Sequence, residues 1–478
     1  MNKAGQYLRT HLWQLRVSER RTLLLTGDFL AAVLAWGISI YYWGMSERFM
    51  GFSLEFLQKR VPVWFYFLPL IWLVLMVELY DVHRAADWGT TVRGVAGAAL
   101  IGLVLYLALY FYYYSPPKSL LPRRGVASYL IAVFVLTLLW RWLYIQIFTG
   151  SRFMRRVLLV GAGKSGQVLL NVLHGLKSPP FKLVGIIDDD SLKLGSSVEG
   201  IQVIGSSKEL LRLVQENNIS DIIVAITGEM QGGMFQSLLD AQEYGAEIIR
   251  MPTAYEDVLG RVPIMMLEAN WILRSFVDEV RVSGFYTLVK RFIDILGGAF
   301  GTLIMAVLLP FIALLTIIDD GLPIFYTQTR CGKGGQPYNI LKFRTMRRDA
   351  EADGTPRWAR EDDERATRLG KVLRRTHLDE LPQFFNVLRG EMSLVGPRAE
   401  RPELVEYFQK HIPFYRARLL VKPGITGWAQ VNFGYAATIE ETIFKLEYDL
   451  YYIKHRSIMT DLIILLRTPS TVFGLRGR

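Results

Sequence analysis

Residues 374–398 read RRTHLDELPQFFNVLRGEMSLVGPR, and this stretch places two adjacent carboxylates between arginines. Thr376 is a residue type that caps helices and Pro382 suits a first helical turn, so a helix is predicted to begin around Asp379 and Glu380. A helix N-terminus favours anions, here a phosphate and an ionised Asp379. Because a carboxylate can attack phosphorus and carry the group covalently, we predict that Asp379 is a nucleophile.

Basic side chains surround this pair of acids. Arg374, Arg375 and Arg398 are bidentate phosphate donors by residue type. Two other interpretations stay open: the arginines could be ordinary surface charges, and His377 could be the phosphorylated nucleophile. Cys331, the single cysteine, excludes an intrachain disulfide and has no evident base beside it.

Four blocks occur in one order: KFRTM at 342–346, THLDELPQ at 376–383, SLVGPR at 393–398 and KPGITGWAQVN at 422–432. Together they resemble the polyprenyl-phosphate hexose-1-phosphate transferases, the monotopic phosphoglycosyl transferases of bacterial polysaccharide assembly. The resemblance covers roughly residue 283 to the C-terminus, and the remainder resembles the N-terminal half of the longer members.

The resemblance implies that a hexose-1-phosphate passes from a UDP-sugar to undecaprenyl phosphate, with release of UMP. The product is the first lipid-linked intermediate of exopolysaccharide, capsule or O-antigen synthesis. Asp379 would carry the phosphosugar and bind Mg²⁺, and Glu380 would position or deprotonate a reacting group. The phosphate-binding residues would be Lys342, Arg344, Arg375 and Arg398, and the 423–428 turn would shape the nucleotide end. The sugar is not determined.

Composition and apolar runs predict a membrane protein. Of 478 residues 51% are hydrophobic, and the formal charge is +11. Four apolar stretches, at 22–43, 63–80, 92–114 and 126–148, each have about the length of a transmembrane helix. Basic residues at both flanks favour a cytoplasmic location for both ends. We therefore expect a four-helix transmembrane domain at 1–150, and the family resemblance implies that the membrane is a bacterial inner membrane.

Acids at the ends of these spans, Asp28 and Glu78, are interpreted as interfacial residues. No recognisable nucleic-acid module accompanies the basic charge, so nucleic acid is not an expected partner. Membrane lipid is an expected partner, and a homodimer is compatible with the sequence.

A Rossmann-like, doubly wound parallel sheet is predicted at 151–255. A strand is followed by Gly161, Gly163 and Gly166, a helix, and a second strand that ends in Asp188 and Asp189. This pattern is typical of dinucleotide sites, with one of the acids on a ribose. The alternative is a fold that keeps the tight turn without a nucleotide.

A linker with short strands is expected at 256–284, followed by a membrane element at 285–320. In the resembled family this element is a helix-break-helix that enters and leaves one membrane face. Lys290, Arg291, Asp294 and Pro310 match its motif, and Pro310 removes a helix hydrogen bond. A straight fifth span is the alternative, with the catalytic domain facing away from the cytoplasm.

An α+β catalytic domain is expected at 321–478, facing the cytoplasm. Two strands, 324–330 and 338–344, flank a glycine turn, residues 349–365 form a charged loop, and the last helices are interfacial or packed on the core.

Two other functions remain open. One is an NAD-dependent nucleotide-sugar dehydratase or epimerase, for which Tyr286 with Lys290, or Tyr338 with Lys342, would supply a Tyr-x-x-x-Lys pair. The other is a non-enzymatic membrane nucleotide sensor or scaffold.

Overall fold

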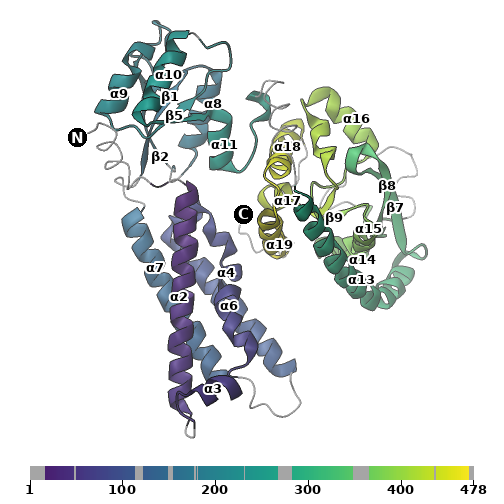
Figure 1. The fold of residues 1–478 in the computed structure, drawn as a ribbon. Coiled ribbons are helices and arrows are strands. Elements are labelled where there is room, and N and C mark those ends of the chain that lie inside the picture. The colour runs from purple at the N-terminus through teal and green to yellow at the C-terminus, as the bar shows by residue number, and fades with distance from the viewer. Residues whose placement is uncertain are drawn as a thin grey trace. The chain divides into compact units, whose positions relative to one another are not determined.

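The computed structural model describes residues 15, 17–47, 50–112, 122–148, 154–176, 179, 181–230, 232–266, 283–347, 365–434 and 438–472. The chain divides into two compact units, Met1–Val258 and Leu259–Arg478 (Figure 1). The first unit contains apolar helices and a largely parallel sheet, as the sequence predicts. The second contains a long apolar helix and a mixed set of helices and short strands.

Apolar helices form the N-terminal part of the first unit: α2 (Val17–Ser46), α4 (Leu68–Leu75), α6 (Trp88–Tyr112) and α7 (Arg123–Phe148), with short helices α3 (Leu54–Lys59) and α5 (Val82–Ala85) between them. By length and composition, Glu19–Ser46, Trp88–Phe111, Arg123–Phe148 and, in the second unit, Gly284–Asp320 could each cross a membrane. Three of the four predicted N-terminal spans are thus long enough to cross a membrane. The helix in the fourth, at 63–80, is too short.

The 63–80 stretch is divided into a 3₁₀ turn (Val63–Phe67), α4 and a second 3₁₀ turn (Val77–Tyr80). Its apolar helical part, Val63–Leu75, is about 20 Å long, shorter than the roughly 30 Å of a bilayer core. Pro69 lies in the first turn of α4 and has no N–H, so the preceding turn cannot continue as an α-helix.

Asp28 is not interfacial, which corrects the prediction. Its side chain is fully buried and pairs with Arg141, with 2.6 Å between Asp28 Oδ2 and Arg141 Nη2. Arg141 also donates to the carbonyl of Leu79 at 2.8 Å. A desolvated carboxylate needs such a partner, so the pair ties α2 to α7 and to the turn after α4. Glu78 is part-exposed and lies 3.7 Å from Arg84.

The α/β part of the first unit is a six-stranded sheet in the order β3-β4-β2-β1-β5-β6. Its strands are β1 (Arg155–Val160), β2 (Phe181–Ile187), β3 (Ser197–Val198), β4 (Ile201–Gly205), β5 (Asp221–Val224) and β6 (Glu247–Arg250). β3 is antiparallel to β4, and the other pairs are parallel. The five parallel strands thus have the doubly wound order third-second-first-fourth-fifth.

Helices cover both faces of this sheet. α9 (Leu210–Glu216) and α10 (Gly232–Tyr244) pack on the face that carries Leu158 and Val160. α8 (Lys164–His174) packs on the other face, where Gly166 approaches Leu159, and α11 (Met251–Leu259) follows β6. Residues 256–259 of the predicted linker are therefore helical, and its 267–282 part lies outside the described residues.

The second unit begins with a 3₁₀ turn (Ile264–Met266), α13 (Gly284–Asp320) and a hairpin of β7 (Phe325–Cys331) with β8 (Pro337–Phe343). The remaining elements are α14 (Arg368–Arg375), a 3₁₀ turn (Leu378–Glu380), α15 (Gln383–Arg389), β9 (Ser393–Val395), α16 (Pro402–His411), a 3₁₀ turn (Tyr415–Leu420), β10 (Gly424–Thr426), α17 (Trp428–Asn432), α18 (Ile439–Lys454) and α19 (Ile458–Val472). The predicted hairpin is confirmed. Residues 348–364, most of the predicted charged loop, lie outside the described residues.

α13 packs on the second unit along its length. Gly297, Gly298 and Gly301 have no side chain, and an added Cβ at each would lie within 3.0 Å of Leu394, Leu388 or Phe384. Toward the other end, Ile312 packs with Phe343 and Leu373. One helix runs from Gly284 to Asp320 with Pro310 inside it, so the predicted break does not divide the element into two helices. Both ends of a helix about 55 Å long therefore contact the same unit.

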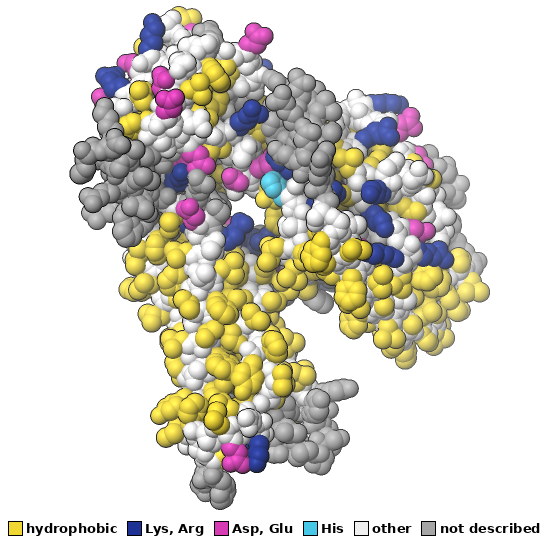
Figure 2. Space-filling model, in the orientation of Figure 1, with side chains coloured by type: hydrophobic (Ala, Val, Ile, Leu, Met, Phe, Trp, Pro, Cys, Tyr) yellow, Lys and Arg dark blue, Asp and Glu magenta, His cyan; other side chains and the backbone are white. Residues whose placement is uncertain are grey.

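The opposite face of α13 is exposed and apolar. Its exposed residues are Phe285, Leu288, Phe292, Ile295, Leu296, Phe300, Leu303, Ile304, Val307, Phe311, Leu314, Leu315, Ile317 and Ile318. Figure 2 shows hydrophobic side chains gathered along the edge of the second unit where α13 runs in Figure 1. An apolar surface of this size is typical of a membrane or protein contact.

Candidate active site

The two predicted catalytic acids lie in a short 3₁₀ turn, Leu378–Glu380, between α14 and α15. Thr376 does not cap a following helix, which corrects the prediction. It is the C-cap of α14 and its hydroxyl donates to the carbonyl of Val372 at 2.8 Å. His377 has a left-handed backbone (φ 55°), which ends α14 and turns the chain. The sequence analysis expected a helix N-terminus to attract anions at this turn. Because α15 has only seven residues, the positive charge around the turn comes mainly from side chains.

Glu380 binds the two cations of the site. Its Oε1 lies 2.7 Å from Lys342 Nζ and 2.6 Å from Arg398 Nη2. Burial acts to raise the pKa of the Glu380 carboxyl, but Arg398 and Lys342 outweigh it and hold this pKa well below its usual range. Glu380 is therefore ionised at neutral pH and fixes a lysine from β8 and an arginine from the loop after β9 around the turn.

Asp379 has the opposite environment. Its side chain is buried, with 8% of its surface exposed, and it has no hydrogen bond or ion pair with any residue that the structure describes. Burial raises the pKa of its carboxyl, against the attraction of Lys342 and with the repulsion of Glu380. A carboxylate without partners, beside two fixed cations, is available to react with a bound phosphate.

Arg398 reaches this turn because two distant motifs pack against each other. β9 and β10 pair in parallel, with Ser393 opposite Gly424, and an isolated bridge joins Arg398 to Gly424. The backbones are so close that a Cβ on Gly424 would lie 2.1 Å from the nitrogen of Gly396. The glycines of both motifs therefore set the position of Arg398.

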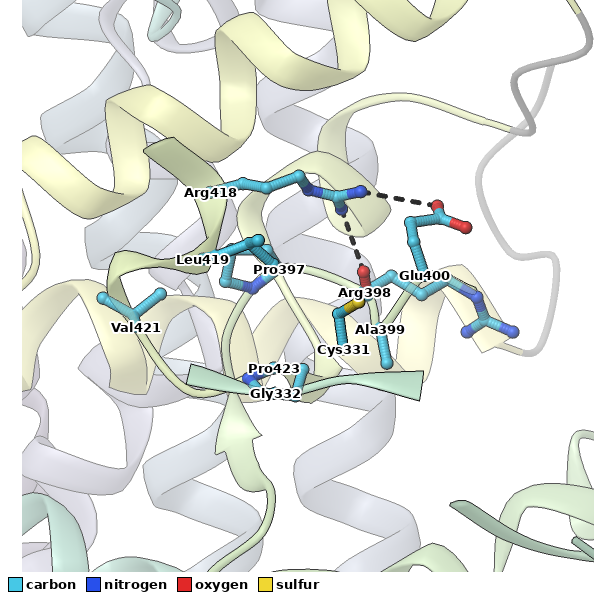
Figure 3. A pocket seen from close by; sticks show the side chains of 10 residues that line it. All are labelled: Cys331, Gly332, Pro397, Arg398, Ala399, Glu400, Arg418, Leu419, Val421 and Pro423. Carbon is cyan, nitrogen blue, oxygen red and sulfur yellow. Dashed lines mark hydrogen bonds and ion pairs between the residues drawn. The ribbon is translucent and has the colours of Figure 1, made fainter. Parts of the chain in front are cut away.

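Arg418, which the sequence analysis did not select, supports Arg398 from behind. Its Nη2 donates to the carbonyl of Arg398 at 2.9 Å and to Asp449 at 2.9 Å. Figure 3 shows Arg418 in a small pocket, directed toward that carbonyl and toward Glu400, while the Arg398 side chain extends away. Glu400 also binds Lys445 at 2.8 Å. An isolated arginine in sequence gives no sign of such a contact.

Two predicted phosphate ligands lie elsewhere. Arg344 is buried and holds the C-terminal end of α13: its Nη2 donates to the carbonyls of Asp320, at 3.0 Å, and Gly321. Its Nη1 is buried and has no hydrogen-bond partner within the part of the chain that the structure describes. Arg375 is exposed at the end of α14. The structure thus groups Lys342 and Arg398 with the two acids, gives Arg344 a contact with α13, and leaves Arg375 at the surface.

The predicted membrane-helix motif anchors α13 to the catalytic turn's surroundings. Arg291 donates to the carbonyls of Val387 (2.9 Å) and Leu388 (2.8 Å), near the end of α15. Asp294 accepts hydrogen bonds from the Ser393 hydroxyl and the Leu394 N–H, both at 2.9 Å. These contacts link the helix to α15 and β9, which lie between the Asp379 turn and Arg398 in sequence.

Lys290 joins a second network. It binds Asp461 Oδ2 at 2.8 Å, and Tyr286 donates to the same oxygen at 3.0 Å. Tyr452 donates to Asp461 Oδ1 at 2.8 Å. The Tyr286–Lys290 pair is therefore engaged in packing α13 against α18 and α19.

A magnesium ion would have few protein ligands here. No group of three His, Cys, Asp or Glu side chains that could hold a metal occurs among the described residues. Glu380 is occupied by cations, which leaves the Asp379 carboxylate. Mg²⁺ is commonly bound by one or two carboxylates together with substrate phosphates and water, so the donor set fits an ion that arrives with a diphosphate.

The glycine turn of the first unit, residues 161–166, is hydrogen-bonded to Asp188, which directly follows β2. Asp188 Oδ2 accepts from the Ala162 N–H at 2.7 Å and lies 3.4 Å from Lys193, and its Oδ1 accepts from the Asp190 N–H at 2.9 Å. Gly161 has φ 106°, and a Cβ on Gly166 would lie 2.3 Å from the Gly161 oxygen. Gly161 and Gly166 are thus required by the packing of the turn itself, whereas a Cβ on Gly163 would meet nothing within 4 Å.

Comparison with known proteins gives two family matches. Residues 285–475 match the bacterial sugar transferase family, and residues 76–251 match the CoA-binding domain family. The chain is 31% identical over 319 residues to the UDP-glucose:undecaprenyl-phosphate glucose-1-phosphate transferase of Escherichia coli, covering 66% of this chain and 67% of that protein.

Two further relatives match the C-terminal part at higher identity. The UDP-N-acetylgalactosamine-undecaprenyl-phosphate N-acetylgalactosaminephosphotransferase of Aeromonas hydrophila is 42% identical over 224 residues, covering 46% of this chain and 52% of that protein. The match thus spans about half the length of that relative. A UDP-glucose:undecaprenyl-phosphate glucose-1-phosphate transferase of Caulobacter vibrioides is 42% identical over 183 residues, covering 38% and 68%. The chain belongs to the bacterial sugar transferase family, a family of enzymes.

Proposed function

We propose that this protein transfers a hexose-1-phosphate from a UDP-sugar to undecaprenyl phosphate and releases UMP. The observation that carries the proposal is the contrast between the environments of the two adjacent acids in one turn. Glu380 holds Lys342 and Arg398, whereas the adjacent Asp379 is buried and has no partner among the described residues. Family membership and the activities for which the relatives are named support the same reaction.

The reaction would proceed in two displacements at the same phosphorus. An Asp379 oxygen bonds to the β-phosphorus of the UDP-sugar, the bond from that phosphorus to the bridging oxygen breaks, and its electron pair leaves with UMP. An oxygen of undecaprenyl phosphate then bonds to the phosphorus and the bond to Asp379 breaks, which regenerates the carboxylate. Lys342 and Arg398 offset the charge that develops on the phosphate oxygens.

When bound, Mg²⁺ would neutralise the diphosphate, with Asp379 as its protein ligand. Glu380 keeps the two cations in place throughout, because its own carboxylate stays ionised between them. The turn at 423–428 packs against the loop that carries Arg398 and would shape the nucleotide end of the site.

We also propose that α13 enters and leaves the same face of the bacterial inner membrane, with the catalytic unit in the cytoplasm. Its buried face contacts the second unit from Tyr286 to Asp320, whereas a membrane-crossing helix would need about 20 residues free of that unit. Its exposed face is mostly apolar, with Asp319 at its C-terminal end. This arrangement would bring Asp379 to the level of a lipid phosphate.

The experiment is UMP release by membranes containing the protein, with undecaprenyl phosphate, Mg²⁺ and a panel of UDP-glucose, UDP-galactose, UDP-N-acetylglucosamine and UDP-N-acetylgalactosamine. We expect one sugar to give UMP and a lipid-linked product, and Asp379→Ala to lose at least about 10³-fold in both. Activity that survives in Asp379→Ala would contradict the nucleophile assignment. Turnover of no UDP-sugar by folded protein would contradict the transferase proposal.

The dehydratase and scaffold alternatives have less support. Lys290 and Tyr286 are both bound to Asp461, and Lys342 is bound to Glu380, so neither Tyr-x-x-x-Lys pair has a free lysine. A nucleotide in the α/β domain, the role suggested by the match to a CoA-binding domain family, would have to compete with the bonds that Asp188 makes to the glycine turn. Tightly bound NAD in purified protein would revive the dehydratase alternative.

A further inference from the structure

Gln383 has a buried amide nitrogen without a hydrogen-bond partner among the described residues. The residue is 3% exposed, and its Nε2 is buried. A buried donor without an acceptor destabilises the folded protein, and most buried donors in native proteins are hydrogen-bonded. The residue therefore calls for an explanation other than packing.

The position of Gln383 relates it to the catalytic turn. The backbone is helical from Leu378 onward, because Leu381 N–H donates to Leu378 O at 3.2 Å and Phe384 N–H to Leu381 O at 3.1 Å. Asp379, Gln383 and Asn386 are all buried and follow one another at spacings of four and three residues. Gln383 and Asn386 therefore share one face of α15, and Asp379 lies about one turn before Gln383, in the preceding 3₁₀ turn.

That face is directed toward β8. Asn386 accepts from Leu341 N–H at 3.1 Å and donates to Asn339 O at 2.9 Å, and at the other end Glu380 binds Lys342. Gln383 lies between these two contacts, one turn from the acids. Among the described residues, the Gln383 amide nitrogen is thus a donor without an acceptor, and the Asp379 carboxylate about one turn before it is an acceptor without a donor.

We propose that Gln383 is a further catalytic residue, whose Nε2–H donates to an oxygen of Asp379 while that side chain carries the phosphosugar. This inference rests on the proposed function. In the first displacement one Asp379 oxygen bonds to phosphorus. The other oxygen accepts the Gln383 hydrogen bond. In the second displacement the bond between phosphorus and Asp379 breaks, its electron pair returns to the carboxylate, and the amide stabilises the negative charge that forms there.

The experiment compares full-length wild type with Gln383→Met, which keeps the volume and removes the donor. We expect kcat for UMP release with the sugar selected above to fall about 10²-fold, the effect of removing one oxyanion donor, with KM within about twofold. Because the donor is unpaired in the free protein, Tm should be unchanged or higher. Gln383→Asn retains an amide and should recover at least about fivefold in kcat over Gln383→Met.

The matched control is Asn386→Leu, which removes an amide of the same helix that already has partners, including Glu391 at 2.7 Å. We expect its Tm to fall by at least about 5 °C. The inference is overturned if Gln383→Met does not fold or melts as low as the control, because the amide is then a structural contact. It is equally overturned if kcat is unchanged, or if Gln383→Asn is no better than Gln383→Met. Activity in Asp379→Ala would refute the proposed function separately.

Discussion

Two adjacent acids lie in the catalytic turn of the second unit, and two others follow β2 beside the glycine turn of the first. The two pairs differ in how many bonds the fold supplies to their carboxylates. In the glycine turn, Asp188 binds the Ala162 and Asp190 N–H groups and Lys193. In the catalytic turn, Glu380 takes both cations and Asp379 has no partner among the described residues. An acid with all its bonds supplied by the fold contributes to stability, whereas an acid without bonds is available to a ligand.

This difference indicates which motif can act chemically. Both patterns are recognisable in the sequence, yet the spacing of acids and glycines does not reveal whether a carboxylate is already bonded. The comparison predicts that replacing bonded acids changes stability, and that replacing Asp379 or the groups around it changes turnover.

Glu380→Gln should have the largest effect in these comparisons. A neutral amide no longer fixes Lys342 and Arg398 as ion pairs, so both cations become mobile and Arg398 loses its position at the turn. We expect kcat for UMP release to fall by about 10²–10³-fold, as for other losses of positioned charge. If kcat is nearly unchanged, Glu380 is only a structural acid like Asp188, and the two turns differ less than we infer.

Glu400 sharpens the comparison, because it is a bonded acid in the same unit as Asp379. Burial acts to raise its pKa, but Lys445 and Arg418 outweigh this and hold the pKa of the Glu400 carboxyl at about 2. A depressed pKa contributes stability that is present above about pH 4.3 and is lost as the pH falls toward 2. The Tm of wild type should therefore fall as the pH is lowered through this window. In Glu400→Gln, up to about 3 kcal/mol of the accompanying loss in the free energy of unfolding should be absent. Identical profiles would show that the ion pairs do not contribute.

Asp188→Asn should have the smallest effect. Burial acts to raise the pKa of the Asp188 carboxyl, but the Asp190 and Ala162 N–H groups and Lys193 lower it overall, so its stabilisation is also lost as the pH falls through the acid range. We expect a loss of about 1 kcal/mol at pH 7 because the site is partly solvated, and UMP release within about twofold of wild type. A rise in wild-type Tm with about 1 mM NADH or coenzyme A would break the comparison, since the glycine turn would then bind a ligand.

Much of the fold could be predicted from local patterns. The apolar runs predicted α2, α6 and α7, and the alternation of strands with helices predicted the parallel sheet. The prediction of a single span at 63–80 was less accurate. That stretch is divided into short helices, and Pro69 lies in the first turn of α4. The cap at Thr376 was wrong, because helix α14 already ends there and His377 turns the chain.

The sequence by itself determined the family, the acid pair and the basic residues that could accompany it, because these follow from residue types at short spacing. Only the tertiary structure decided how they are used. Arg398 reaches Glu380 because β9 and β10 pair, Arg344 is directed to α13, and Arg141 neutralises Asp28 across 113 positions. Long-range contacts of this kind depend on how the helices and strands pack. Local residue patterns therefore do not show which distant side chain forms a given hydrogen bond.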